Sequence, residues 1–171
     1  TNKKTYTGND AGGTFAEMTG PALASDIVTQ LTFRNKWFGT NGSDKIQIST
    51  DSLTRVAIVE VGTDRRGRVL AAHDGRLWVM GDPNNEAQAY YSNVLDETNF
   101  PAGNLLYLNF SAGEQVLGAV RIGLPSQGSD RFGGLVILTN VAAYIVLGVG
   151  STSDPYYVQP LGDVGLVSVV S

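Results

Sequence analysis

The stretch LAAHDGRLWVMGDPNNEAQAYYSNVLDETNFP, residues 70–101, carries the pattern that decides the fold. Three strand-like runs follow one another in and just before it, at residues 69–73, 76–80 and 88–92. Asp74 and Gly75 join the first two runs, and the polar segment 81–86 joins the second and third. Short turns between strand-like runs predict antiparallel strands that are neighbours in one sheet.

The same pattern repeats along the chain. Val-Leu-Ala-Ala at residues 69–72 corresponds to Val-Leu-Gly-Ala at residues 116–119, and strong hairpins follow them, beginning at residues 77–80 and 135–138. Residues 27–31 and 36–38 take the same places further upstream. Successive first strands begin roughly 40 to 50 residues apart, which is the period of four-stranded propeller blades. The first strands contain small residues. Such residues are expected in the innermost strands of a propeller, because these strands crowd around its axis.

We therefore expect an all-β fold, a β-propeller or part of one, with about three four-stranded blades at residues 26–65, 66–112 and 113–162. The other strands are expected at residues 29–34, 36–40, 45–49, 55–61, 105–110, 116–123, 135–139, 142–148 and 156–159. Asn41 and Gly42 predict a hairpin turn, because both residue types tolerate positive φ. A β-sandwich is the alternative, since regular strand spacing suits either architecture.

Neither end of the pattern is complete. Residues 166–171 start a strand of the kind that opens a further blade, and residues 4–7 resemble an outer strand. Propellers have roughly four to eight blades, so we expect one domain over residues 1–171 that is a fragment of a longer propeller. A ring completed by another chain is the alternative, because an apolar strand at a sheet edge invites pairing.

Length and charge exclude several classes of protein. The chain has 171 residues and a formal net charge of −4, which argues against a general nucleic-acid binder with a basic face. It has no cysteine, so disulfide and thiolate chemistry are excluded. No apolar run reaches the roughly 20 residues of a membrane-spanning helix, and we expect no membrane insertion.

Residues with catalytic potential are few and scattered. His73 is the only histidine, and no G-x-S-x-G motif accompanies it, so we expect a hydrogen-bonded residue at a turn. One histidine without cysteine does not make a zinc site. A glycosidase-like carboxylate pair has its candidates at predicted turns and loops: Asp51, Asp74, Asp82, Glu86, Asp96 and Glu97. Solvated loop carboxylates are the alternative that we favour, and we expect no enzyme and no cofactor.

The loop after the second strand-like run has the residue types of a calcium site. Asp82, Asn84 and Glu86 place oxygen groups at alternate positions, although the full calcium-loop pattern is missing. The alternative is a hairpin loop in which Asp82 bonds the backbone just beyond it and Pro83 fixes φ. We favour the hairpin loop over the metal site.

Two further segments carry a hypothesis each. Arg65, Arg66 and Arg68 form the only basic cluster, which is either an interaction surface for an acidic partner or phosphate, or a solvated loop. Residues 48–54, Ile-Ser-Thr-Asp-Ser-Leu-Thr, partly resemble the Asp box of sialidase-like propellers, without its Gly and Trp. The Asp box is a structural hairpin element in that family, so this likeness supports a fold rather than an activity.

Residues 75–79, 81–85, 90–92 and 96–101 read in turn as the strand G-R-L-W-V, the turn G-D-P-N-N, the strand end Y-Y-S and an acidic stretch ending in F-P. This succession resembles a segment of propellers in tail and virion proteins of tailed bacteriophages. The family's segment runs from a strand of the type G-R-L-[WF]-V through G-D-P-x-N and Y-[YF]-S to an acidic stretch ending in [WF]-P. Residues 35–45, 134–140 and 143–148 resemble further family hairpins. Residues 163–168 resemble a segment that normally leads into more blades, with Leu166 in place of the usual Cys.

The resemblance implies a structural component of the virion, of the tail hub or nozzle type of short-tailed phages. It implies copies of the chain itself and other tail proteins as partners, with DNA passing through the ring without specific binding. An acidic surface suits such a channel wall. Two alternatives stay open. One is a carbohydrate-binding or glycosidase-like propeller that uses Trp78, Tyr90 and Tyr91 on a host-surface glycan, and the other is a bacterial surface adhesin.

Overall fold

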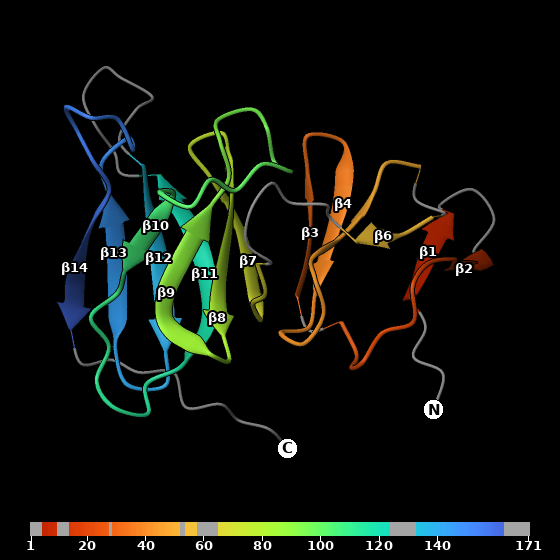
Figure 1. Cartoon of the computed structure of the whole chain (residues 1–171), viewed down its shortest axis with the longest axis horizontal. Helices are drawn as coiled ribbons and strands as arrows, with labels where there is room; N and C mark the ends of the chain where they lie inside the picture. The colour runs from red at the N-terminus through yellow and green to blue at the C-terminus, as the bar shows by residue number, and fades with distance from the viewer. Residues whose placement is uncertain are drawn as a thin grey trace.

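The computed structural model of the chain describes residues 5–9, 14–27, 29–51, 54–57, 65–123 and 133–162. These residues form fourteen β-strands in four antiparallel sheets and contain no helix, which confirms the predicted all-β class (Figure 1). Three of the sheets have four strands each, and the fourth has two.

Each four-stranded sheet is a meander, because its strands are neighbours in the sheet in the order of the sequence. Sheet one comprises β3 (Thr29–Phe33), β4 (Lys36–Thr40), β5 (Gln47–Ser49) and β6 (Val56–Ala57). Sheet two comprises β7 (Val69–His73), β8 (Arg76–Asp82), β9 (Asn85–Tyr91) and β10 (Leu105–Tyr107). Sheet three comprises β11 (Val116–Gly123), β12 (Gly133–Thr139), β13 (Ala143–Leu147) and β14 (Tyr157–Gly162).

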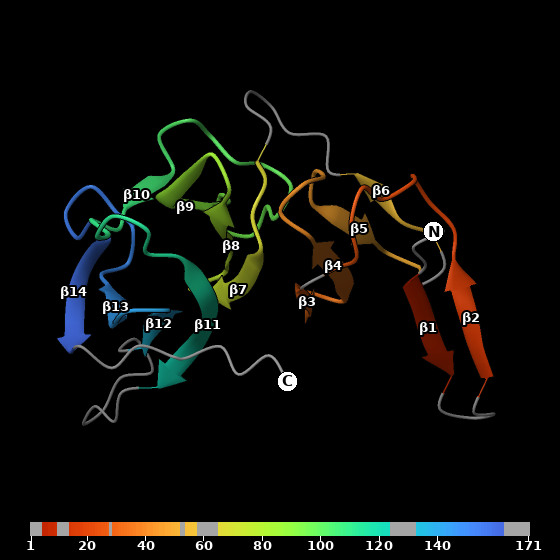
Figure 2. The same ribbon diagram turned by 90° about the horizontal axis from the view of Figure 1, so that it is seen from below.

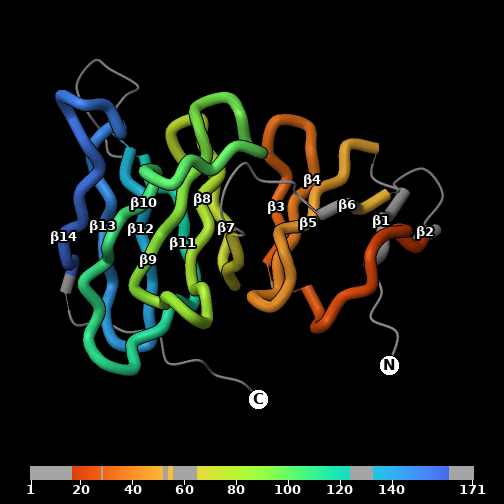
Figure 3. Tube along the Cα trace, in the orientation of Figure 1, coloured from red at the N-terminus to blue at the C-terminus, as the bar shows by residue number. Residues whose placement is uncertain are grey.

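The first strands of the three sheets lie side by side, since β3 contacts β7 and β7 contacts β11. The later strands of each sheet lie progressively further from these first strands, so that the sheets fan out (Figure 2). The two-stranded sheet, β1 (Thr5–Asn9) and β2 (Thr14–Met18), lies at the opposite end of the molecule from sheet three (Figure 3). The described sheets form an open row and do not close a ring.

The core lies between the sheets in two clusters, and sheet two contributes to both. Trp78 and Met80 of β8 belong to the cluster shared with sheet three, whereas Leu77 and Val79 of the same strand belong to the cluster shared with sheet one. Side chains alternate between the two faces of a strand, so β8 is buried on both faces. This burial explains why Leu-Trp-Val-Met is continuously apolar instead of alternating with polar residues.

Two hairpins close with two-residue turns in which both residues have positive φ. Asp74 and Gly75 join β7 to β8 with φ values of 51° and 69°, as the sequence predicted. Arg34 and Asn35 join β3 to β4 with φ values of 51° and 60°. The strand expected at residues 29–34 therefore ends at Phe33, and Arg34 belongs to the turn. Positive φ at both central residues is typical of the type I′ turn, which matches the twist of antiparallel strands.

The loop predicted at residues 81–86 is shorter in the structure. Strands β8 and β9 continue through it and leave only Pro83 and Asn84 as the turn, after a register shift between Met80 and Asp82. Gly81 lies at this bulge with a φ of 71°, which glycine adopts without strain. The predicted backbone bond is confirmed, because the amide of Asn84 donates to Asp82 Oδ1 at 2.9 Å.

Other predicted bounds also change. Of Asn41 and Gly42 only the glycine has positive φ, at 79°, and the Asn41 side chain shapes the loop by accepting the amides of Ser43 and Asp44 at 3.0 and 2.8 Å. The strands expected at 45–49 and 105–110 shorten to three residues each, and residues 5–9 pair in the separate two-stranded sheet. The expected further strand at 166–171, residue 4 and residues 58–61 of the expected strand at 55–61 lie outside the described residues.

Candidate functional site

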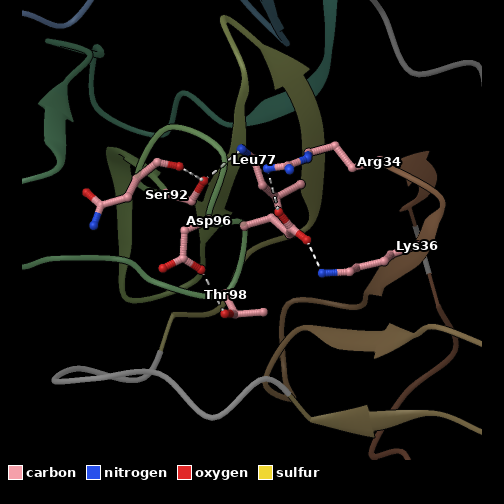
Figure 4. Close-up of polar contacts among 8 residues, drawn as sticks. Arg34, Lys36, Leu77, Ser92, Asp96 and Thr98 are labelled. Carbon is pink, nitrogen blue, oxygen red and sulfur yellow. Dashed lines mark hydrogen bonds and ion pairs between the residues drawn. The ribbon is translucent and has the colours of Figure 1, made fainter.

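Glu97 forms an ionic junction between sheets one and two. Its Oε2 lies 3.4 Å from Arg34 Nη1, and its Oε1 accepts a hydrogen bond from Lys36 Nζ (Figure 4). Arg34 belongs to the β3–β4 turn and Lys36 opens β4, whereas Glu97 lies in the loop between β9 and β10. The Glu97 side chain is nearly fully buried, while both cations stay partly exposed.

The electrostatics of this junction favour the ionised carboxylate. Burial alone raises the pKa of Glu97. Hydrogen bonds from Lys36 and the backbone, together with the charges of Lys36 and Arg34, outweigh burial and leave the pKa of Glu97 below its usual value. At neutral pH the Glu97 carboxylate is therefore ionised and lies against the two cations.

The loop that presents Glu97 is fixed on β8 by its own hydrogen bonds. Ser92 Oγ accepts the amide of Leu77 at 3.0 Å, and the amide of Ser92 donates to the carbonyl of Leu77 at 2.9 Å. Further along, Thr98 Oγ1 donates to Asp96 Oδ1 at 3.0 Å (Figure 4). Hydrogen bonds within sheet two therefore hold the loop that places Glu97 against sheet one.

A second junction joins the same two sheets through the segment before β7. Thr29 Oγ1 of β3 donates to the carbonyl of Arg68 at 2.6 Å, and Thr40 Oγ1 of β4 donates to the carbonyl of Gly67. A Cβ at Gly67 would lie 2.5 Å from the carbonyl oxygen of Met80, so only glycine fits this approach. Both junctions consist of structural hydrogen bonds and ion pairs between elements.

The three arginines of the predicted basic cluster have separate partners within the chain. Arg65 is 7% exposed and its guanidinium lies 4.2 Å from the ring centroid of Tyr90. Arg66 Nη1 donates to the carbonyl of Ser43 at 2.7 Å, and Arg68 forms an ion pair with Glu86. Their role as an interaction surface stays a prediction. Any partner would have to compete with these contacts.

The calcium candidates are also engaged with protein groups. Asp82 Oδ2 lies 3.4 Å from the hydroxyl of Tyr90, and Glu86 Oε1 accepts from Arg68. Burial raises the pKa of Glu86, the charge of Arg68 lowers it, and the nearby Asp82 raises it further, with a net rise. Within the described ranges no three His, Cys or acidic side chains come together in a way that would hold a metal ion.

The other candidate carboxylates lie in different places and are bonded to other groups of the protein. Asp51 Oδ1 accepts the amide of Thr54 at 2.7 Å. Asp74 Oδ2 accepts the hydroxyl of Tyr156 at 2.9 Å. Asp96 is bonded to Thr98 as described above. The sequence could not indicate the Asp74 contact, because 82 residues separate its two partners.

His73 ends β7 directly before the Asp74–Gly75 turn, as predicted, and its carbonyl accepts a hydrogen bond from Trp78 Nε1 at 3.3 Å. The residue is 5% exposed, and neither ring nitrogen has a hydrogen-bond partner among the residues that the structure describes. Burial lowers the pKa of His73; the charge of Asp74 raises it and that of Arg121 lowers it, with a net fall. His73 lines a cavity of about 430 Å³ together with Asp74, Val94, Arg121, Gly133, Gly148 and Val149.

The three aromatic residues considered for glycan binding lie in the core. Trp78 is fully buried and Tyr90 is 3% exposed. The ring of Trp78 lies 4.8 Å from those of Tyr91 and Tyr156, measured between centroids. The rings of Trp78 and Tyr91 therefore pack between sheets two and three, and the ring of Tyr90 packs between sheets one and two. Trp78 and Tyr90 offer no open platform for a sugar.

Comparisons with known proteins do not assign the chain to a family. No family model, curated protein or solved structure matches it. In the described part of the chain, no helix has the length and apolar character needed to cross a bilayer.

Proposed function

We propose that the chain is a non-enzymatic structural component of a bacteriophage virion, a β-propeller or part of one, of the tail hub or nozzle type. The observation that carries this proposal is the row of three consecutive meanders whose first strands lie side by side. In a propeller, successive four-stranded sheets radiate from an axis that their first strands line. The fan of sheets in Figure 2 has the arrangement expected of adjacent blades.

The connectivity favours a propeller over a sandwich. A β-sandwich has Greek-key connections, so neighbouring strands in its sheets come from distant parts of the sequence. Here every four-stranded sheet is made of consecutive strands only. Small residues also recur in the strands that would be innermost, with Ala71 and Ala72 in β7 and Gly118 and Ala119 in β11.

The virion role is supported by the place in the fold of the segment that resembles the phage propellers, residues 75–101. Residues 75–79 and 81–85 form the buried hairpin of sheet two, and residues 96–101 contain Glu97 of the ionic junction. The segment thus contributes to the core of sheet two and to its contact with sheet one, as expected of a structural element. The net charge of −4 suits a wall past which DNA slides.

The test is the genomic neighbourhood of the complete reading frame, followed by mass spectrometry of purified particles. We expect portal, adaptor and capsid genes beside it, and peptides of this chain in tailed particles that were purified through a density gradient. A locus without such genes, or particles that lack the chain, would contradict the proposal. A glycan array and a hydrolysis screen address the carbohydrate alternatives, and an export signal in the full reading frame would favour an adhesin.

A further inference from the structure

We propose that His73 makes the contact between sheets two and three acid-sensitive, so that protonation of its imidazole separates these two sheets locally. His73 ends β7 on the face that meets sheet three, after Val69 and Ala71 of the shared core cluster. It is buried there, and its ring centroid lies 6.2 Å from that of Trp78 and 6.4 Å from that of Tyr156. This response requires only the packing of the two sheets and is independent of the virion role.

The packed ring has no place for a second proton. Both ring nitrogens of His73 are shielded from solvent, and neither has a hydrogen-bond partner within the described residues. A neutral imidazole leaves one N–H group and one lone pair unpaired in this position, whereas an imidazolium would leave two N–H groups and a positive charge unpaired. An unpaired buried charge costs more than an unpaired neutral group. The proton is therefore accommodated only when the packing around the ring opens.

The charged groups around His73 do not offset this cost. Asp74 of the β7–β8 turn favours the imidazolium, but its Oδ2 already accepts the hydroxyl of Tyr156, whose own pKa is raised by burial so that it stays neutral. Arg121 of β11 disfavours the imidazolium, and Arg76, which is paired with His73 in the hairpin, is a second cation. Burial has the largest effect, and the net result is a lowered pKa of His73.

The pH dependence of the contact has a defined direction. In the open state the imidazole is hydrated and has its ordinary pKa of about 6.5, whereas in the closed state its pKa is lower. As the pH falls below about 6.5, the open state takes up a proton that the closed state does not, so acid favours opening. Between pH 7.5 and 5.5 the equilibrium constant for opening should rise about tenfold.

The contact between sheets one and two has a different residue at the corresponding place. Phe33 ends β3 directly before its two-residue turn, as His73 ends β7. Phe33 packs against the core cluster that sheets one and two share. Phenylalanine takes up no proton, so the acid response should be confined to the contact between sheets two and three. His73→Phe is therefore the substitution that removes the response and keeps an aromatic ring in the contact.

Cysteine labelling of the full chain measures the two contacts separately, because the chain has no cysteine of its own. Val146→Cys places a thiol in the cluster between sheets two and three, and Val79→Cys places one between sheets one and two. Both valines are fully buried, so the two variants are matched. The reagent is dithiodipyridine, and each labelling rate is divided by that of the urea-unfolded chain at the same pH. From pH 7.5 to 5.5 we expect this ratio to rise about tenfold at Val146→Cys and less than about twofold at Val79→Cys.

Two further measurements assign the response to His73. Combining His73→Phe with Val146→Cys should remove the pH dependence of labelling. In the wild type, the single histidine gives one imidazole signal in an NMR spectrum, and this signal should keep its neutral position from pH 7.5 to about 5.5. The NMR titration needs no substitution and serves if His73→Phe fails to fold.

Four outcomes would overturn the proposal. The first is a folded-state imidazole signal that titrates with a midpoint above about pH 5.5. The second is labelling at Val146→Cys that does not respond to pH. The third is an equal response at Val79→Cys, because the opening would then involve the whole fold. The fourth is a response that persists after His73→Phe.

Discussion

At the residue scale, the Glu97 side chain forms the ionic contact between sheets one and two. Replacing it with glutamine keeps the shape but removes the charge that faces Lys36 and Arg34. Both cations are partly exposed and can return to water, so Glu97→Gln should lower the free energy of unfolding by only about 1–2 kcal/mol. Urea denaturation measures the change. The exposed Asp154→Asn is the control and should change stability by less than about 0.5 kcal/mol.

The same carboxylate gives a pH dependence with a defined sign. The folded-state pKa of Glu97 is lowered, so its contribution is complete above the pKa of the unfolded chain, which is about 4.3. As the pH falls below that value, the unfolded chain takes up the proton first and the contribution declines. The stability difference between wild type and Glu97→Gln should therefore be constant from about pH 6 to 7 and shrink below about pH 4.3. A difference that grows on acidification would contradict this assignment.

The two tryptophans should respond differently to the same substitution. Trp78 is fully buried against Tyr91 and Tyr156 and donates from Nε1 to the carbonyl of His73 at 3.3 Å. Trp37 is only half-buried, and its Nε1 donates to the exposed Gln30. Trp78→Phe should cost about 2 kcal/mol and Trp37→Phe less than about 1 kcal/mol in denaturant melts. Equal costs would place Trp78 outside the core.

At the element scale, the segment after β13 depends on one glycine. Gly148 has a φ of 95°, and a Cβ there would lie 2.3 Å from the carbonyl oxygen of Pro155. Gly148→Ala should therefore destabilise the chain by about 2–4 kcal/mol, measured as the shift in a denaturant midpoint. Gly103 has no atom within 4 Å of such a Cβ, so Gly103→Ala is the control and should stay within about 0.5 kcal/mol.

The strands and the repeat could be predicted from the sequence because their signals are local. Asp74 and Gly75 are typical positive-φ residues, and the turn that they form was predicted correctly. The turn at Arg34 was missed, because arginine is not a residue that indicates positive φ. The cavity could not be predicted at all, since its lining comes from five separate segments of the chain that only the packing of sheet two on sheet three brings together.

At the scale of the whole molecule, sheet two is the middle layer and both of its faces are buried. One interface is reinforced by the Glu97 junction and by the segment before β7, while the other encloses the aromatic cluster around Trp78 and borders the cavity. Successive sheets thus pack against one another twice, through different side chains, with β3, β7 and β11 as neighbours along the row. Repetition of one packing step around an axis is what generates a propeller.

An experimental structure of the complete protein, by crystallography or cryo-electron microscopy, tests this account most directly. We predict that the four-stranded sheets radiate from one axis, with β3, β7 and β11 as innermost strands. A two-layer sandwich, or a structure in which these three strands do not adjoin a common axis, would contradict the propeller and the virion role proposed from it.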